Sequence, residues 1–297
     1  MTRLALEIGP VRFAAGRVAD DVGEDEIRRI PVPDRGVWDA CRELLLDVAG
    51  SIEVSSVGIA AAGPIDMAAG IVAPTEISEW RTGFAIVEQV RKLFPAAEVR
   101  LAFDGVCLAL AERNFGATST VMDSLSIFVS DRVVAGISVG GFTVVGRTGN
   151  AGHIGHMLVP GFDDRCGCGG RGCLEAVASE GAVLRWATGQ GWTGGSAENL
   201  LAAAVAGESI PVAALERAGT ALGRVVASVA PLLDIDLVAV GGPLAQSGSP
   251  LWKPIGTAVA THARLGFLTG LRVVPSELGA VGVLAGAGVL AMTESDD

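Results

Sequence analysis

The sequence predicts an α/β protein built as two lobes with a cleft between them. Apolar segments of strand length alternate with segments of helical periodicity along the 297 residues. Two of the apolar segments, in separate halves of the chain, end in glycine: SVGIAAAG at residues 56–63 and DLVAVGG at residues 236–242. Strands buried on both faces of a parallel sheet have this appearance, and ligands of such sheets bind at the strand ends.

The first lobe is expected to cover residues 1–117. Its opening residues alternate apolar and polar side chains on either side of Gly9-Pro10, which is typical of a pair of strands. Later segments have helical spacing or the continuous apolar character of buried strands. The predicted elements are two strands within residues 1–19, a helix over 37–49, a strand over 56–63, a helix over 84–94, a strand over 98–103 and a helix over 105–116.

The second lobe is expected to cover residues 118–280 and to open with three consecutive strands. The predicted elements are strands over 125–131, 133–139 and 142–147, helices over 178–189, 196–206 and 210–233, a strand over 236–242, a helix over 250–265 and a strand over 271–276. The apolar tail from Val281 is too short to span a bilayer. We expect residues 281–297 to form a buried helix that completes the first lobe.

The charge balance disfavours nucleic acid and membranes as partners. The chain holds 33 Asp and Glu against 22 Lys and Arg, for a net charge of −11, and no basic face is evident. The N-terminal MTRLALEIG runs directly into strand-like sequence and lacks the features of a signal peptide. We therefore expect a cytoplasmic protein.

The densest ligand chemistry of the chain lies in residues 153–175. Four nitrogen and sulfur ligands occur there within a glycine-rich loop: His156, Cys166, Cys168 and Cys173. Four such ligands suit a tetrahedral zinc ion, and because no coordination position stays open, the zinc is expected to be structural. The alternative is a group of incidental reduced thiols. Cys41 and Cys107 are expected to be ordinary core residues.

These residues resemble the ROK family of repressors and sugar kinases. The resemblance rests first on AGHIGHMLVPGFDDRCGCGGRGCLE and extends to LALEIG, GPIDMAAG, FDGVCLALAE and DLVAVGG. It implies the actin-like (ribonuclease H-like) fold, zinc bound by the histidine and three cysteines, and phosphorylation of a hexose or N-acylhexosamine by ATP and magnesium. Family repressors carry a helix-turn-helix domain before this fold; here the first strand begins at residue 3, so we expect no such domain. A homodimer is expected by the same analogy.

The resemblance assigns roles on the sugar side. Asp104 matches the family's catalytic base, although an aspartate between strand and helix is also typical of a helix N-cap. Glu175 matches a glutamate that binds sugar hydroxyls, and His156 is expected to bind sugar through one ring nitrogen and zinc through the other. His153 is similar to the histidine of some bacterial N-acetylmannosamine kinases, which points to an N-acylated amino sugar; the alternative is a loop histidine without a ligand.

Two positions on this side depart from the family pattern. The family's Asn-Asp pair is Phe103-Asp104 here, and an expected Asn-Leu pair is Glu76-Ile77. Phe103 cannot donate a hydrogen bond to a sugar hydroxyl. We therefore expect the affinity or specificity for sugar to differ from the family norm.

The phosphate side departs further. Gly9, Gly136, Gly241 and Gly242 match glycines of the family's ATP-binding loops. The first loop, however, reads Glu7-Ile8-Gly9-Pro10-Val11-Arg12, in which Pro10 has no amide hydrogen, and the second, residues 130–136, keeps only its last glycine. Arg12 or Arg132 could offset part of this loss. Two functions stay open: an ATP-dependent sugar kinase, or a non-catalytic protein that binds sugar or serves as a structural or regulatory partner.

Overall fold

The structure, a computed structural model, describes residues 2–18 and 27–293. Residues 1 and 19 of the predicted first pair of strands therefore lie outside the described residues. The chain divides into two compact units. The first comprises Met1–Asn114, Thr143–Gly152 and Val281–Asp297, and the second comprises Phe115–Phe142 and His153–Ala280.

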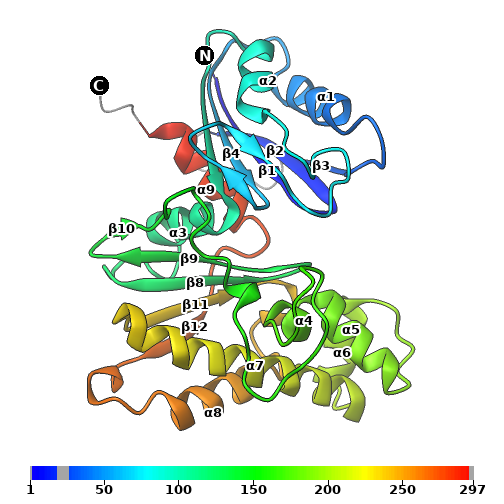
Figure 1. The fold of residues 1–297 in the computed structure, drawn as a ribbon, viewed down its shortest axis with the longest axis vertical. Helices are drawn as coiled ribbons and strands as arrows, with labels where there is room; N and C mark the ends of the chain where they lie inside the picture. The colour runs from blue at the N-terminus through cyan, green and yellow to red at the C-terminus, as the bar shows by residue number, and fades with distance from the viewer. Residues whose placement is uncertain (1, 19–26, 294–297) are drawn as a thin grey trace. The chain divides into compact units, whose positions relative to one another are not determined.

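The first unit is built on a five-stranded sheet in the order β3-β2-β1-β4-β7 (Figure 1). Its strands are β1 (Thr2–Ile8), β2 (Arg12–Val18), β3 (Arg28–Pro31), β4 (Val54–Ala61) and β7 (Glu98–Phe103). β1, β4 and β7 run parallel, whereas β2 and β3 extend the sheet as antiparallel strands. The carboxyl ends of β1, β4 and β7 therefore meet at one edge, where ligands of α/β sheets bind.

Among the described residues of this unit, four helices and a small hairpin complete the fold. They are α1 (Val37–Ala49), α2 (Ile86–Leu93), α3 (Asp104–Phe115), α9 (Gly282–Met292) and the hairpin of β5 (Ile65–Asp66) with β6 (Ile71–Val72). The sequence did not predict β3, β5 or β6, because strands of two to four residues carry too little periodicity to recognise. Within the helix expected over 281–297, α9 covers Gly282–Met292 and packs on β1 and β4, while residues 294–297 lie outside the described residues.

Helix α9 approaches its neighbours so closely that only glycine fits at two positions. A Cβ on Gly58 of β4 would lie 1.9 Å from the Ala287 carbonyl oxygen, and one on Gly286 would lie 1.8 Å from the Cys107 carbonyl oxygen of α3. The Ser56 hydroxyl also donates a hydrogen bond of 2.7 Å to the Ala291 carbonyl. The backbone of α9 therefore lies directly against both β4 and α3.

A loop carboxylate caps the N-terminus of α1. The position before α1 is Gly36, which has a φ of 68° and no side chain to accept a hydrogen bond. Glu79 instead accepts hydrogen bonds from the amides of Gly36, at 2.9 Å, and Val37, at 3.0 Å. Trp80 stacks on Phe84 beside it, with ring centroids 4.5 Å apart.

The segment Thr143–Gly152 belongs to the first unit although the chain on either side of it belongs to the second. The predicted strand over 142–147 is wrong beyond its first residues, because β10 covers only Phe142–Thr143. A turn at Gly146, with a φ of 75°, follows it. What holds the segment is its hydrogen bonding to the turn that follows β4, described below.

The second unit contains another five-stranded sheet, in the order β10-β9-β8-β11-β12. Its strands are β8 (Ser124–Val129), β9 (Val133–Val139), β10, β11 (Leu237–Gly241) and β12 (Arg272–Pro275). β8, β11 and β12 are parallel, and β9 returns antiparallel to β8. The α/β class predicted from the sequence is confirmed in both units.

The helices of the second unit follow the predictions with two adjustments. They are α4 (Glu175–Ala178), α5 (Glu180–Gly189), α6 (Ala197–Val205), α7 (Ser209–Leu233) and α8 (Trp252–His262), with short 3-10 turns at Ile154–His156, Pro243–Ala245 and Gly266–Leu268. The predicted helix over 178–189 begins only after Ser179, whose extended backbone ends α4 and whose hydroxyl caps α5. The predicted helix over 250–265 is shorter, because α8 ends at His262.

Across residues 2–18 and 27–293, no single helix is both long and apolar enough to cross a membrane. The consecutive helices α6 and α7 meet that criterion only jointly, and they are bent by 105° relative to each other. One face of α7 packs into the hydrophobic core of the second unit through residues that include Leu215, Leu222 and Val226.

Gly286→Ala should destabilise the protein by at least about 2 kcal/mol, because the added methyl group would overlap the backbone of α3 and force α9 to move. Gly256→Ala in α8 is the matched control, since a Cβ at that exposed helical position meets no atom within 4 Å. The control should gain about 0.5–1 kcal/mol from helix propensity. Urea denaturation measures the free energy of unfolding of both variants. Equal stability of the two would contradict the close contact between α9 and α3.

Candidate functional site

The predicted zinc ligands come together in the second unit. The ligand atoms of His156, Cys166, Cys168 and Cys173 all lie within 4.8 Å of one another. The sulfurs of Cys168 and Cys173 are 3.8 Å apart, and the Cys166 sulfur lies 3.8 Å from Nδ1 of His156. A zinc ion with Zn–S bonds of about 2.3 Å and Zn–N bonds of about 2.1 Å sets these edges at about 3.6–3.8 Å. The geometry of the four residues therefore fits tetrahedral zinc.

The loop that carries the cysteines is closed by its own backbone. The Cys166 amide donates to the Gly170 carbonyl at 2.9 Å, and the Gly169 amide donates back to the Cys166 carbonyl at 3.1 Å. Gly169 has a φ of 91°. At Gly172, with a φ of 74°, a Cβ would lie 2.8 Å from the Phe162 carbonyl oxygen. Glycine is therefore required at both turns for the thiols to converge.

Two ion pairs hold the approach to this loop. Arg171 donates to both carboxylate oxygens of Asp163, at 2.9 and 2.5 Å, and Arg217 of α7 donates to Asp164 at 2.5 Å. The Arg217 guanidinium also lies over the Phe162 ring, 5.0 Å from its centroid. The Asp164–Arg217 pair, whose side chains are only 32% and 19% exposed, ties the loop to the core helix.

Glu175 follows the last cysteine by two residues and begins α4. Its Oε2 accepts a hydrogen bond of 3.3 Å from the Val133 amide, at the start of β9. Gly155, one residue before His156, leaves room for this contact: a Cβ there would lie 2.4 Å from the Val133 carbonyl oxygen and 3.1 Å from Oε2 of Glu175. The carboxylate is therefore positioned jointly by the ligand loop and by β9.

His153 lies beside His156 in the same unit, with ring centroids 6.0 Å apart. Burial, followed by the charges of His156 and Arg132, lowers the pKa of His153 to about 4. The ring is therefore neutral near pH 7 and offers one donor and one acceptor. Because Nδ1 of His156 faces Cys166, its Nε2 is the ring nitrogen that remains for a partner outside the cluster.

The second predicted phosphate loop is a tight turn between β8 and β9. Val129 pairs with Val133, so the turn contains only Ser130, Asp131 and Arg132. The Ser130 amide donates to the Arg132 carbonyl at 2.8 Å, and the Val133 amide is bonded to Glu175. These two backbone donors are therefore engaged within the protein, while the Asp131 carboxylate is exposed.

The glycines predicted on the nucleotide side are explained by packing. A Cβ on Gly242, which has a φ of 117°, would lie 1.9 Å from the Val129 carbonyl oxygen, and one on Gly241 would lie 2.9 Å from Cβ of Ser276. Gly136 pairs with Ser126 in the middle of the β8–β9 ladder and is buried. Gly241 and Gly242 therefore each have a packing requirement for glycine that does not involve nucleotide.

In the first unit, the sheet edge brings Glu7 and Asp104 together. Glu7 is the penultimate residue of β1, and Asp104 directly follows β7, which is separated from β1 only by β4. Two strand spacings of about 4.8 Å set their lateral separation at about 10 Å. The pKa of the Cys107 thiol supports this arrangement, because it is raised first by burial and then by the charges of Asp104 and Glu7.

Asp104 is only 6% exposed and begins α3. Its Oδ1 accepts a hydrogen bond of 2.8 Å from the amide of the next residue, Gly105. The carboxylate therefore lies in the first turn of α3, where a negative charge is favoured.

The two departures on the sugar side are core residues. Phe103 is fully buried, and Ile77 is 2% exposed. Phe103 therefore adds to the hydrophobic core of the first unit at a position where the family pattern has asparagine, whereas Ile77 keeps the apolar character of the leucine that it replaces. Glu76, in contrast, is exposed.

The first predicted phosphate loop is the turn between β1 and β2. The Gly9 amide donates to the Arg12 carbonyl at 3.0 Å, and Pro10 has no amide hydrogen to offer. Val11 is 55% exposed and brings an apolar side chain to the tip of the turn. Neither Gly9 nor Pro10 therefore offers an amide hydrogen to a phosphate.

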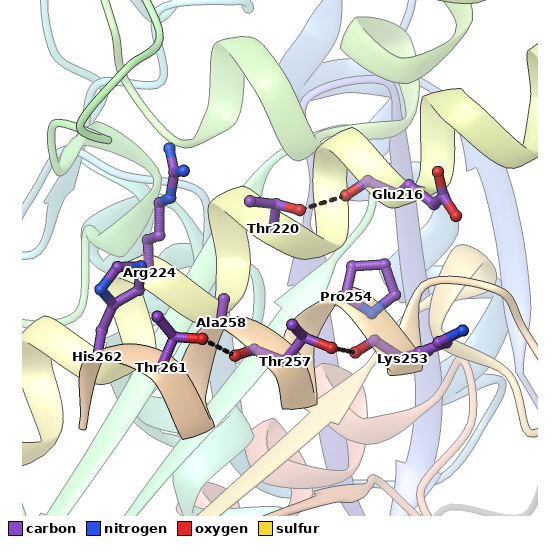
Figure 2. A pocket seen from close by; sticks show the side chains of 9 residues that line it. All are labelled: Glu216, Thr220, Arg224, Lys253, Pro254, Thr257, Ala258, Thr261 and His262. Atoms are coloured by element: carbon purple, nitrogen blue, oxygen red, sulfur yellow. Dashed lines mark hydrogen bonds between the residues drawn. The ribbon is translucent and has the colours of Figure 1, made fainter. Parts of the chain in front are cut away.

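A separate groove of about 400 Å³ lies between α7 and α8 (Figure 2). The hydroxyls of three threonines in it, Thr220, Thr257 and Thr261, donate to carbonyls of their own helices at 2.7–2.9 Å. Three basic residues, Arg224, Lys253 and His262, are among those that line it (Figure 2). None of the site residues predicted from the sequence lines this groove.

One polar residue of the first unit was not foreseen. Asn150 accepts a hydrogen bond of 2.8 Å from the Ile65 amide and donates one of 2.6 Å to the Ile65 carbonyl. Its partner is 85 residues away in the sequence, and no local sequence pattern predicts such a contact. Its only sequence signal is its place immediately before the AGHIGH motif.

Comparison with known proteins identifies the family. Residues 4–294 match the profile of the ROK family. The chain is 32% identical over 246 residues to an N-acetylmannosamine kinase of Citrobacter koseri, across 82% of this chain and 83% of that protein. It is 27% identical over 309 residues to the glucokinase of Thermotoga maritima, across 97% of this chain and 96% of that enzyme.

Solved structures agree. A ROK glucokinase from Streptomyces griseus, in complex with glucose and AMPPNP, superposes with a TM-score of 0.86 at 25% identity and covers 98% of this chain and 99% of its own. A ROK hexokinase from Thermus thermophilus superposes with a TM-score of 0.76 at 27% identity, covering 98% of each chain. The actin-like sugar-kinase fold implied by the sequence is confirmed, and the chain belongs to the ROK family.

Proposed function

We propose that the protein is an ATP-dependent kinase of a hexose or an N-acylhexosamine. The observation that carries this proposal is that two carboxylates, Asp104 and Glu7, lie at the same sheet edge in the first unit of a ROK-family chain. The relative from Citrobacter koseri is an N-acetylmannosamine kinase. The histidine at position 153 likewise favours an N-acylated amino sugar as the substrate.

Asp104 is assigned as the general base. It accepts the proton of the sugar hydroxyl while the hydroxyl oxygen attacks the γ-phosphorus of ATP and ADP departs. Its position in the first turn of α3 favours the ionised carboxylate that this role requires. The hydrogen bond from the Gly105 amide to Oδ1 holds the carboxylate in place at the start of α3.

Glu175, His156 and His153 are assigned to the sugar hydroxyls and the acyl group. Glu175 is oriented by the Val133 amide, and His156 by its contact with the thiol cluster. The neutral ring of His153 suits a hydrogen bond to an uncharged sugar substituent. Glu7 is the carboxylate of this chain suited to magnesium, because oxygen ligands are those that magnesium prefers.

The second candidate is a sugar-binding protein without phosphoryl transfer. The two turns favour it, because the Gly9 and Ser130 amides are engaged within their own turns and Pro10 has no amide hydrogen. An Asp131 carboxylate at ~4 Å from a phosphate would add a repulsion of about 4 kcal/mol at an effective dielectric constant near 20. Arg12, which begins β2, or Arg132, in the β8–β9 turn, could offset part of that repulsion.

We also propose that His156, Cys166, Cys168 and Cys173 hold a structural zinc ion. Four protein ligands complete a tetrahedron, so the metal stabilises the loop and leaves no position for a reacting water. The homodimer and the cytoplasmic location expected from the sequence stay predictions.

A sugar-dependent ADP-release assay tests the function, with glucose and N-acetylmannosamine in the first panel. Asp104→Asn should lower kcat by at least about 100-fold, because the amide cannot accept the proton. Asp123→Asn is the matched control: its carboxylate accepts from the Gly140 amide in an exposed hairpin, and kcat should stay unchanged.

Calorimetric titration of the same sugars separates the two candidates. Turnover that depends on both sugar and Asp104 contradicts the non-catalytic function. Sugar binding with no detectable ADP release and no ATP binding contradicts the kinase.

Metal analysis of the purified chain should find about one zinc per protein. A chelator should lower the melting temperature by at least about 5 °C, because zinc binding is coupled to folding of the loop. Cys173→Ala should lose the metal, whereas Cys41→Ala, at a buried cysteine outside the cluster, should retain it. Full zinc content in Cys173→Ala would overturn the ligand assignment.

A further inference from the structure

We propose that Asn150 is a positioning residue for sugar binding, because its side chain clamps the segment that leads into the substrate-binding histidines to the turn after β4. The inference rests on the proposed function. Asn150 itself is assigned no contact with sugar, zinc or ATP; it acts through the two chain segments that it joins.

The clamp consists of three side-chain hydrogen bonds. Oδ1 of Asn150 accepts from the Ile65 amide at 2.8 Å, and Nδ2 donates to the Ile65 carbonyl at 2.6 Å and to Oγ1 of Thr148 at 3.0 Å. A side-chain amide that pairs with both groups of one residue replaces the two hydrogen bonds of a strand neighbour. It fixes the distance and the orientation of the two segments together.

The segment depends on such contacts because it contains little regular structure of its own. Between Thr143 and Gly152 the chain forms turns, with positive φ values at Gly146, Gly149 and Gly152. One further bond reinforces the clamp, from the Met67 amide to the Thr148 carbonyl at 3.1 Å. A Cβ on Gly149 would lie 2.8 Å from Cβ of Met67, so the two segments are in direct contact.

Chain connectivity joins this clamp to both halves of the proposed chemistry. Asn150 precedes His153 by three residues, which span at most about 11 Å of extended chain. Ile65 lies the same number of residues after Ala62, whose amide bonds to the end of β1 at Ile8. The clamp therefore joins the segment just before His153 to the turn just after β4, and both segments are connected by a few residues to the parts of the chain that carry the proposed site residues.

The residue type matters as well as the contact. An aspartate at position 150 would keep the acceptor for the Ile65 amide but would turn an oxygen toward the Ile65 carbonyl. An alanine would remove all three bonds. A residue that only filled space would tolerate both changes, whereas a positioning residue should not tolerate either.

The test measures sugar affinity, turnover and stability in Asn150→Asp and Asn150→Ala. Both variants should raise the Kd for the sugar that the wild-type protein binds by at least about 10-fold and raise KM more than they lower kcat. Amide hydrogen exchange at Ile65 and Met67 should become faster. Asn199→Ala is the matched control, because Nδ2 of Asn199 also donates to a loop carbonyl, that of Gly194 at 2.8 Å; its Kd should equal that of the wild type.

A loss of melting temperature like that of Asn199→Ala, with an unchanged Kd, would overturn the positioning role and leave the proposed function intact. Absence of sugar binding by the wild-type protein would instead overturn the proposed function, and the inference with it. If Asn150→Ala does not fold, Asn150→Asp, which keeps the size of the side chain, decides the question.

Discussion

The first unit depends on the direct contact between the backbone of α9 and its two neighbours. Gly58 and Gly286 remove the side chains that would separate α9 from β4 and from α3. Since α3 begins at Asp104 and β4 lies between β1 and β7, this one helix supports every element that meets at the sheet edge. The position of the proposed catalytic base therefore follows from a contact made by the last helix of the chain, far from it in sequence.

In the second unit, the loop of residues 156–173 has the corresponding role of positioning a carboxylate, that of Glu175. The thiols and the imidazole of the proposed zinc site converge within residues 156–173, and Glu175 follows only two residues after Cys173. The contact of Glu175 with the Val133 amide adds a second support from β9. The ion pair of Asp164 with Arg217 extends this support to α7, so the residues proposed to bind sugar are held by the core of the unit as well as by the loop.

The sequence predicted what depends on periodicity and on dense local ligands. The alternation of strands and helices, the four-residue cluster and the place of Asp104 between β7 and α3 were all readable in short windows of residues. The short strands β3, β5 and β6 were not, because their pairing is decided by partners elsewhere in the chain. Asn150 was missed for the same reason: its importance arises from Ile65, with which it shares no local pattern. The break at Ser179 depends on one backbone angle that helical periodicity cannot reveal.

The altered phosphate side is best understood as a change in how backbone amides are used. A loop that binds phosphate must leave several amides without an internal partner, and glycine permits the conformations that expose them. In this chain the Gly9 and Ser130 amides close their own turns, and the Val133 amide orients Glu175 instead. The same donor cannot serve both a phosphate and the carboxylate of Glu175. If Glu175 binds sugar as proposed, the contact that orients its carboxylate therefore takes the Val133 amide away from the proposed phosphate site.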